Sequence, residues 1–135
     1  MSVNYLAVLV ATLAVFIIGW LWYSPMLFGN LWLRLSKVSQ KDITKAKNKG
    51  MTHLIISGFI ATLVTALVFE YLLDMFGITD MYTGILLSLL LWIGFLVTSM
   101  LNSVLWEGKP FSVYVINIFH QLVCMIVMGA ILTAW

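Results

Sequence analysis

Four long apolar stretches constrain the fold of this sequence more than any other feature. They cover residues 3–23, 52–73, 82–106 and 111–135. A bilayer core about 30 Å thick requires about 20 apolar residues in a helix that rises ~1.5 Å per residue. The strands of a membrane β-barrel would alternate between apolar and polar over about ten residues, whereas these stretches are continuously apolar. The sequence therefore predicts an all-α, polytopic membrane protein, a bundle of four transmembrane helices.

Composition excludes the main soluble classes. Hydrophobic residues make up 63% of the chain and charged residues only 9%, whereas a soluble domain is about half apolar and a quarter charged. An ordinary soluble enzyme, a disordered linker and a nucleic-acid module are all excluded, and we expect no nucleic-acid partner. The first stretch ends in Trp20, Trp22 and Tyr23 and has no preceding basic residue, so it indicates a span rather than a signal peptide. We expect residues 1–135 to form a single membrane domain.

The basic residues predict the orientation of the spans. Six of the seven lie in the first connection, namely Arg34, Lys37, Lys41, Lys45, Lys47 and Lys49. The seventh, Lys109, lies in the third connection, whereas the second contains Asp74 and Asp80. Basic loops stay on the cytoplasmic side. We therefore expect a multi-pass protein of the cell inner (plasma) membrane, with the basic loop 34–49 in the cytoplasm and both termini outside.

The segment after the first span, residues 25–50, is the most polar part of the chain. Pro25 follows Ser24. Proline is favoured at the first position of a helix, so we expect a helix to start at Pro25 with Ser24 as its N-cap. Residues 26–38 place apolar and polar side chains on opposite faces at helical spacing. This pattern predicts a cytoplasmic-side interfacial amphipathic helix that meets lipid headgroups through Trp32, Arg34 and Lys37. The alternative is a short extension of the first span.

The lysine-rich part of this connection follows a capping signal. Ser39, Gln40, Lys41 and Asp42 resemble a capping box and predict a short polar helix that ends near Gly50. Its lysines indicate a topology signal with affinity for anionic headgroups. Membrane lipids, anionic ones included, are therefore the expected partners.

The fourth stretch contains a polar stripe in the middle of the membrane. Asn117, His120, Gln121 and Cys124 follow the spacing i, i+3, i+4, i+7 and so share one face of a helix. Polar groups in hydrocarbon need partners. The stripe is either a set of interhelical hydrogen bonds or a polar pathway or ligand site with His120 as a titratable group.

The turn between the third and fourth stretches adds two candidates. Asn102 and Asn117 flank the turn at similar depth and could hydrogen-bond across the hairpin. Glu107 either forms an exposed pair with Lys109 or turns inward beneath the bundle. The candidate polar pathway or ligand site thus comprises Asn102, Glu107, Asn117, His120 and Gln121.

The second stretch has a stripe of small residues and an acid. Gly58, Thr62 and Ala66 recur every fourth residue, a spacing that allows another helix to approach closely. Glu70 is an acid within a span, and such groups are candidates for function. It lies about one turn from the outer end, where it could also reach the membrane surface.

Metal and catalytic chemistry find little support. The single cysteine excludes an intrachain disulfide, and His53 lies at a different depth from His120. His120 and Cys124, four residues apart on one helical face, could suggest a nucleophile pair or two metal ligands, and an intramembrane enzyme would use His120, Glu107 or Cys124. We expect no metal, no cofactor and no catalytic residue.

Several motifs together carry a resemblance to a known family. They are Trp22-Tyr23-Ser24-Pro25 with the residues around it from Gly19 to Trp32, then Gly94-Phe95, Asn102, Glu107, Pro110, His120 and Met128-Gly129-Ala130. Over nearly its whole length the chain resembles the domain of unknown function 1761 family of small prokaryotic membrane proteins. The resemblance implies the fold and the location, implies no mechanism, and marks Trp22, Tyr23, Ser24 and Pro25 as its most specific positions.

The residues leave three function hypotheses. The first is a small transport or channel-like component that acts as a homo-oligomer and uses the polar face of the fourth span. The second is a non-transporting module that binds lipid or a partner protein. The third is an intramembrane enzyme.

Overall fold

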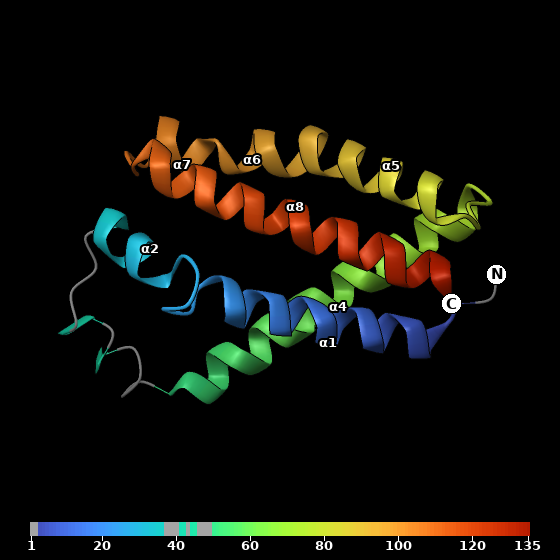
Figure 1. Ribbon diagram of the computed structural model, residues 1–135, viewed down its shortest axis with the longest axis horizontal. Coiled ribbons are helices and arrows are strands. Elements are labelled where there is room, and N and C mark those ends of the chain that lie inside the picture. Colours follow the sequence, from blue (N-terminus) through green and yellow to red (C-terminus); the bar gives the residue numbers. More distant parts are fainter. Residues whose placement is uncertain (1–2, 37–40, 43, 46–49) are drawn as a thin grey trace.

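The computed structural model describes residues 3–36, 41–42, 44–45 and 50–135, and every regular element among them is helical (Figure 1). The elements are α1 (Tyr5–Trp22), α2 (Gly29–Ser36), α4 (Met51–Met75), α5 (Met81–Leu91), the π-helical segment η1 (Trp92–Val97), α6 (Thr98–Met100), α7 (Asn102–Leu105) and α8 (Phe111–Ala134). The all-α fold predicted from the sequence is confirmed. Lys37, Ser39, Gln40, Lys47 and Lys49, on which part of the headgroup and capping predictions rest, lie outside the described residues.

Within the part of the chain that the structure describes, four helical stretches are long and apolar enough to cross a membrane: α1, α4, the run from α5 through η1 and α6 to α7, and α8. They cover residues 5–22, 51–75, 81–105 and 111–134, within a few residues of the predicted spans. Lipid replaces water around such a bundle, so apolar side chains on its outer surface are at no disadvantage. The exposed Ile60, Leu90 and Phe95 illustrate this.

Helix α8 is the centre of the bundle. In Figure 1 it runs beside α5 on one side and α1 on the other, and α4 crosses α1 obliquely. A buried hydrophobic cluster lies where α1, α4 and α8 meet, at the end of the bundle that holds both termini. It consists of Ala7, Val8, Ala11, Ala66, Phe69, Leu73, Met125, Met128 and Leu132.

Helices α5 and α8 cross closely because two glycines face each other. A Cβ atom at Gly129 would lie 2.3 Å from the Ser88 hydroxyl and 3.0 Å from the Gly84 carbonyl. The Ser88 hydroxyl lies 2.8 Å from the Met125 carbonyl, across the interface. Small residues of this kind let helix backbones approach in a membrane.

The third span is held to α8 by two hydrogen bonds at its π-helical segment. The Trp92 indole donates to the Ile118 carbonyl at 2.7 Å, and the Tyr114 hydroxyl donates to the Val97 carbonyl at 2.6 Å. The Val97 carbonyl belongs to the π-helical segment, in which the backbone hydrogen-bond pattern differs from that of an α-helix. The fit between the two spans therefore depends on both side chains.

The turn between α1 and α2 differs from the prediction. Ser24 was expected to N-cap a helix that starts at Pro25, but its hydroxyl donates to the Leu21 carbonyl and α2 begins only at Gly29. The Ser24 carbonyl accepts from the amide of Gly29 at 2.9 Å, and a Cβ atom at Gly29 would lie 2.4 Å from the Tyr23 carbonyl. The absence of a side chain at Gly29 lets the chain fold back this tightly, which the proline rule alone does not reveal.

Helix α2 keeps the predicted amphipathic pattern. Leu31, Trp32 and Leu35 are half-buried, whereas Asn30 and Arg34 are exposed. The half-buried side faces the bundle, because the Trp32 ring meets Tyr23 edge-on at 5.9 Å. The position of α2 in a lipid interface stays a prediction.

Candidate functional site

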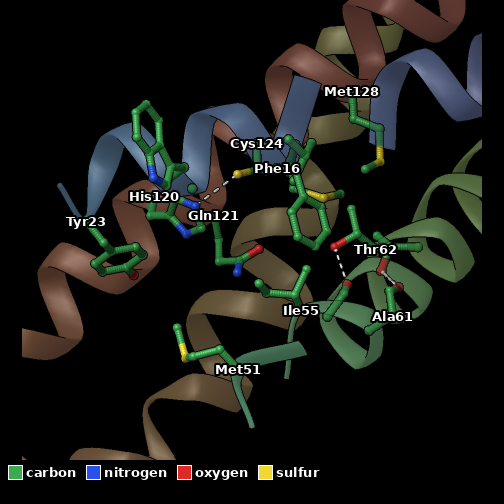
Figure 2. Close-up of a pocket in the computed structure, with 16 residues that line it drawn as sticks. Phe16, Tyr23, Met51, Ile55, Ala61, Thr62, His120, Gln121, Cys124 and Met128 are labelled. Carbon is green, nitrogen blue, oxygen red and sulfur yellow. Dashed lines mark hydrogen bonds between the residues drawn. The ribbon is translucent and has the colours of Figure 1, made fainter. Parts of the chain in front are cut away.

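A cleft of about 600 Å³ lies among α1, α4 and α8 (Figure 2). The first half of α4 lies away from α8, whereas its second half packs into the core (Figure 1). Exposed side chains, including Trp20 on α1 and Ile55 on α4, stand at the edge of the cleft. The cleft is therefore open on the side that faces lipid in a membrane, and α8 forms its floor.

Two polar side chains of α8 form the floor of the cleft. His120 and Gln121 both line it, and the Gln121 amide extends into the space in Figure 2. Among the described residues the Gln121 side chain has no hydrogen-bond partner, whereas His120 Nε2 lies 3.3 Å from Cys124 Sγ. The structure thus brings together three of the four residues of the predicted polar stripe, with one amide free to bind a ligand.

Helix α1 approaches His120 closely because residue 19 is glycine. A Cβ atom at Gly19 would lie 3.4 Å from His120 Nε2. The rings of Trp22 and Tyr23 lie 5.9 and 5.0 Å from the His120 ring. The imidazole is thus held between the end of α1 and its own helix.

Asn117, the fourth residue of the stripe, bonds to a different partner from the expected one. The Tyr23 hydroxyl donates to Asn117 Oδ1 at 2.6 Å. Asn102, the predicted partner, is exposed and lines a second pocket of about 280 Å³ at the α7–α8 turn, together with Asn117 and Glu107. The two asparagines share this pocket, but the hydrogen bond predicted between them is not formed, and Asn117 is bonded to Tyr23 instead.

Glu107 forms the exposed pair that was one of its two predicted arrangements. Its carboxylate lies 3.6 Å from Lys109 Nζ, and the two side chains are about 60% exposed. An exposed pair of this kind contributes little to stability. The inward arrangement of Glu107 beneath the bundle was wrong.

The motif Trp22-Tyr23-Ser24-Pro25 builds one side of the site. Ser24 follows the C-cap of α1, its hydroxyl donates to the Leu21 carbonyl, and Pro25 is exposed in the turn. The Trp22 ring packs against Phe28 at 4.6 Å, and its buried indole nitrogen has no acceptor among the described residues. The motif therefore folds the chain back so that aromatic rings surround His120.

The walls of the cleft are apolar or internally satisfied. Gly58 and Thr62 of the small-residue stripe line it, and the Thr62 hydroxyl donates to the Gly58 carbonyl at 2.9 Å. A Cβ atom at Gly58 would contact the Phe16 ring at 3.6 Å. The stripe therefore packs against α1 of the same chain, and no charged residue is found among the described residues that line the cleft.

Glu70 lies apart from this site, near the far end of α4. Its side chain is only 9% exposed, so it does not reach outward to the membrane surface as the sequence had allowed. The Asn4 backbone amide interacts with its carboxylate, and Oε2 has no hydrogen-bond partner among the described residues. Glu70 lines neither the cleft nor the pocket at the α7–α8 turn.

Few groups at the site could bind a metal ion. Within the described ranges no three histidine, cysteine or acidic side chains gather closely enough to do so. His120 and Cys124 are a pair on one helix, and His53 is exposed at the start of α4. The chemistry that the site offers is hydrogen bonding and ring packing.

The contact between Tyr23 and Asn117 was missed by sequence reasoning, although a signal for it existed. Tyr23 ends the first span, and Asn117 lies within two turns of the start of the fourth. Antiparallel spans place these positions near the same membrane boundary, so matching depths across all spans would have paired them.

Comparison with known proteins places the chain in a family but not beside a characterised relative. Neither the curated proteins nor the solved structures contain a match. One family model, described as "Protein of unknown function (DUF1761)", matches residues 6–133. Because that match covers nearly the whole chain, the protein belongs to the DUF1761 family.

Proposed function

We propose that the protein binds a neutral amphiphile, which enters the cleft among α1, α4 and α8 sideways from the membrane. The observation that carries the proposal is the combination of an open, apolar-walled cleft with the unpartnered Gln121 amide on its floor. Ligand sites in proteins are typically concave and apolar, with a few polar groups that fix orientation. The cleft matches this description.

The lining of the cleft favours a neutral ligand. Moving a charged headgroup out of water is very costly unless an opposite charge meets it. The described lining offers hydroxyl, amide, imidazole and thiol groups but no charge. Arg34 is exposed on α2, outside the cleft. We propose that Arg34, together with the lysines of the loop, binds anionic headgroups at the cytoplasmic surface instead.

The open side of the cleft supports entry from lipid. Ile55, Ala61 and Thr65 of α4 line it and are exposed. An acyl or isoprenoid chain would extend outward between α1 and α4 while the polar head contacts His120 and Gln121. If the spans have the predicted orientation, this half of α4 lies in the cytoplasmic leaflet.

Transport by a homo-oligomer is a second candidate, favoured by the position of Asn117. Asn117 lines the polar pocket at the α7–α8 turn and also bonds Tyr23, which lines the cleft. We propose that a polar route would run through these two residues, from the end of the bundle toward His120. Phe69 and Met128 close the bundle beyond the cleft, so passage would require a second copy. Transport is tested by measuring solute flux across proteoliposomes that contain the protein. The same flux in the wild type and in the double variant His120→Ala, Asn117→Ala would contradict transport through this route.

The binding proposal is tested with a brominated acyl chain, which quenches tryptophan fluorescence on contact. Brominated diacylglycerol is added to protein in phosphatidylcholine nanodiscs, and brominated phosphatidylglycerol serves as the charged comparison. We expect saturable quenching by the diacylglycerol only, because only the neutral lipid enters the cleft beside Trp20 and Tyr23.

Two variants of α4 locate the binding site. Ala61→Phe fills the cleft, whereas Val64→Phe adds the same ring to an exposed position outside it. Saturable quenching should disappear in Ala61→Phe and persist in Val64→Phe. Quenching that rises only in proportion to the amount of diacylglycerol, equally in all three proteins, would overturn the proposal.

A further inference from the structure

We infer that the ligand of this cleft is an isoprenoid quinone, a planar neutral ring with two carbonyl groups and an apolar tail. The inference rests on the proposed function and names its substrate class. Three features of the cleft support it: polar groups able to donate or accept, aromatic side chains for a ring, and an open side for the tail.

The two polar groups on the floor each suit both redox forms of a quinone. A quinone carbonyl only accepts hydrogen bonds, whereas the hydroxyl of its reduced form also donates. The Gln121 amide offers both an acceptor oxygen and a donor nitrogen. His120 does the same through its tautomers: if the Cys124 thiol donates to Nε2, then Nδ1 carries the proton and donates, and in the other tautomer Nδ1 accepts.

The aromatic side chains provide surfaces for a planar ring. Phe16 and Trp20 of α1 line the cleft together with Tyr23, the residue that caps this helix. Aromatic rings pack favourably in offset or edge-to-face arrangements, which a saturated glycerol head cannot use. Met51 and Met128 add polarisable sulfur atoms to the walls. The lining is thus better suited to a ring than to an acylglycerol.

The open side of the cleft fits an isoprenoid tail. The cleft volume of about 600 Å³ lies in the usual range for small-molecule sites. The tail would lie along the exposed apolar residues of α4, Ile55 included, and continue into lipid. A water-soluble ring compound without a tail would make no contact with the open side of the cleft.

Binding is measured with decylubiquinone, a ring with a ten-carbon tail, added to the full chain in phosphatidylcholine nanodiscs. Native mass spectrometry counts the protein molecules that retain it. We expect saturable binding, with dioleoylglycerol as a weaker competitor. Gln121→Leu should weaken binding about tenfold by removing a hydrogen bond. Phe119→Leu, an exposed position on the other side of α8, should leave it unchanged.

The outcomes separate this inference from the proposed function. If dioleoylglycerol binds in the cleft and is lost in Ala61→Phe while decylubiquinone neither binds nor competes, the quinone inference falls and the proposed function stands. If neither amphiphile binds saturably, both fall. Equal binding of decylubiquinone to the wild type and to Ala61→Phe would also overturn the quinone inference, because the ring would then lie elsewhere.

Discussion

The hydroxyl of Tyr23 donates a 2.6 Å hydrogen bond to the side-chain carbonyl of Asn117 and so joins the end of α1 to the first half of α8. The same tyrosine ring lies edge-on to His120 at 5.0 Å. The bond therefore does two things: it satisfies a polar group inside the membrane span, and it fixes an aromatic wall of the cleft beside the imidazole.

Replacement of Tyr23 by phenylalanine should remove this link while keeping the ring. We expect a loss of about 0.6–1.5 kcal/mol in the free energy of unfolding, the usual range for such a bond in a membrane or protein interior. Unfolding in mixed micelles of increasing denaturing detergent measures it. A double-mutant cycle with Asn117→Ala isolates the coupling. Additive effects of the two variants would show that the bond does not contribute to stability.

Replacement of Gly129 by alanine should disrupt the crossing of α5 and α8. The added Cβ atom would lie 2.3 Å from the Ser88 hydroxyl and 3.0 Å from the Gly84 carbonyl, so the Ser88 side chain must lose its bond to Met125 or the two helices must separate. Overpacking of this kind costs about 1–3 kcal/mol. Gly94→Ala is the matched control because nothing lies within 4 Å of its new atom. Similar unfolding midpoints for the two variants would contradict the close approach.

Asp80 should give the start of α5 a dependence on pH. The Thr83 backbone amide and hydroxyl both donate to its carboxylate, at 2.8 and 2.7 Å, and lower the pKa of Asp80 below its ordinary value of 3.8. The pKa of Asp80 is lower in the folded state than in the unfolded state. The cap is therefore fully stabilising when the pH is above the unfolded-state pKa, and this stabilisation is lost as the pH falls through the folded-state pKa.

Hydrogen exchange at the Thr83 amide measures the stability of this cap. Exchange, corrected for its intrinsic pH dependence, should accelerate once the pH drops below 3.8, the ordinary pKa of aspartate. Asp80→Asn keeps an acceptor oxygen but does not titrate in this range, so it should abolish the acceleration. The same pH profile in wild type and variant would show that Asp80 is not its source.

The predicted orientation has a direct check at Lys45, which is exposed. A cysteine placed there, in a Cys124→Ala background, should react with a membrane-impermeant maleimide only after the cytoplasmic side is opened. The expectation follows from the cluster of basic residues in this connection. Labelling of this cysteine in intact cells would show that the loop is outside and would contradict the predicted topology.

The spans were predictable because length and hydropathy alone decide them in a membrane. The helix boundaries of the structure fall within a few residues of the predicted ones. The polar stripe was also predictable, since helical spacing places Asn117, His120 and Gln121 on one face. In a membrane, these local sequence patterns determine where the spans lie regardless of how the helices pack.

The partners of those residues were not predictable in the same way. Asn117 was paired with Asn102 because both flank one turn, but tertiary packing brings Tyr23 closer. The beginning of α2 was misplaced because the steric requirement at Gly29 involves the Tyr23 carbonyl, which local propensity does not include. The cleft itself depends on the angle between α4 and α8, which no periodicity in the sequence specifies.

Binding of a neutral amphiphile in the cleft is tested most directly by a crosslinking map in lipid. A diacylglycerol with a photoreactive group near its head is irradiated with the protein in nanodiscs, and mass spectrometry locates the adducts. We expect adducts at cleft residues such as Phe16 and Ile55, reduced by excess unlabelled diacylglycerol. Adducts spread evenly over exposed apolar positions such as Val64 and Leu90, and unaffected by competitor, would contradict the proposed site.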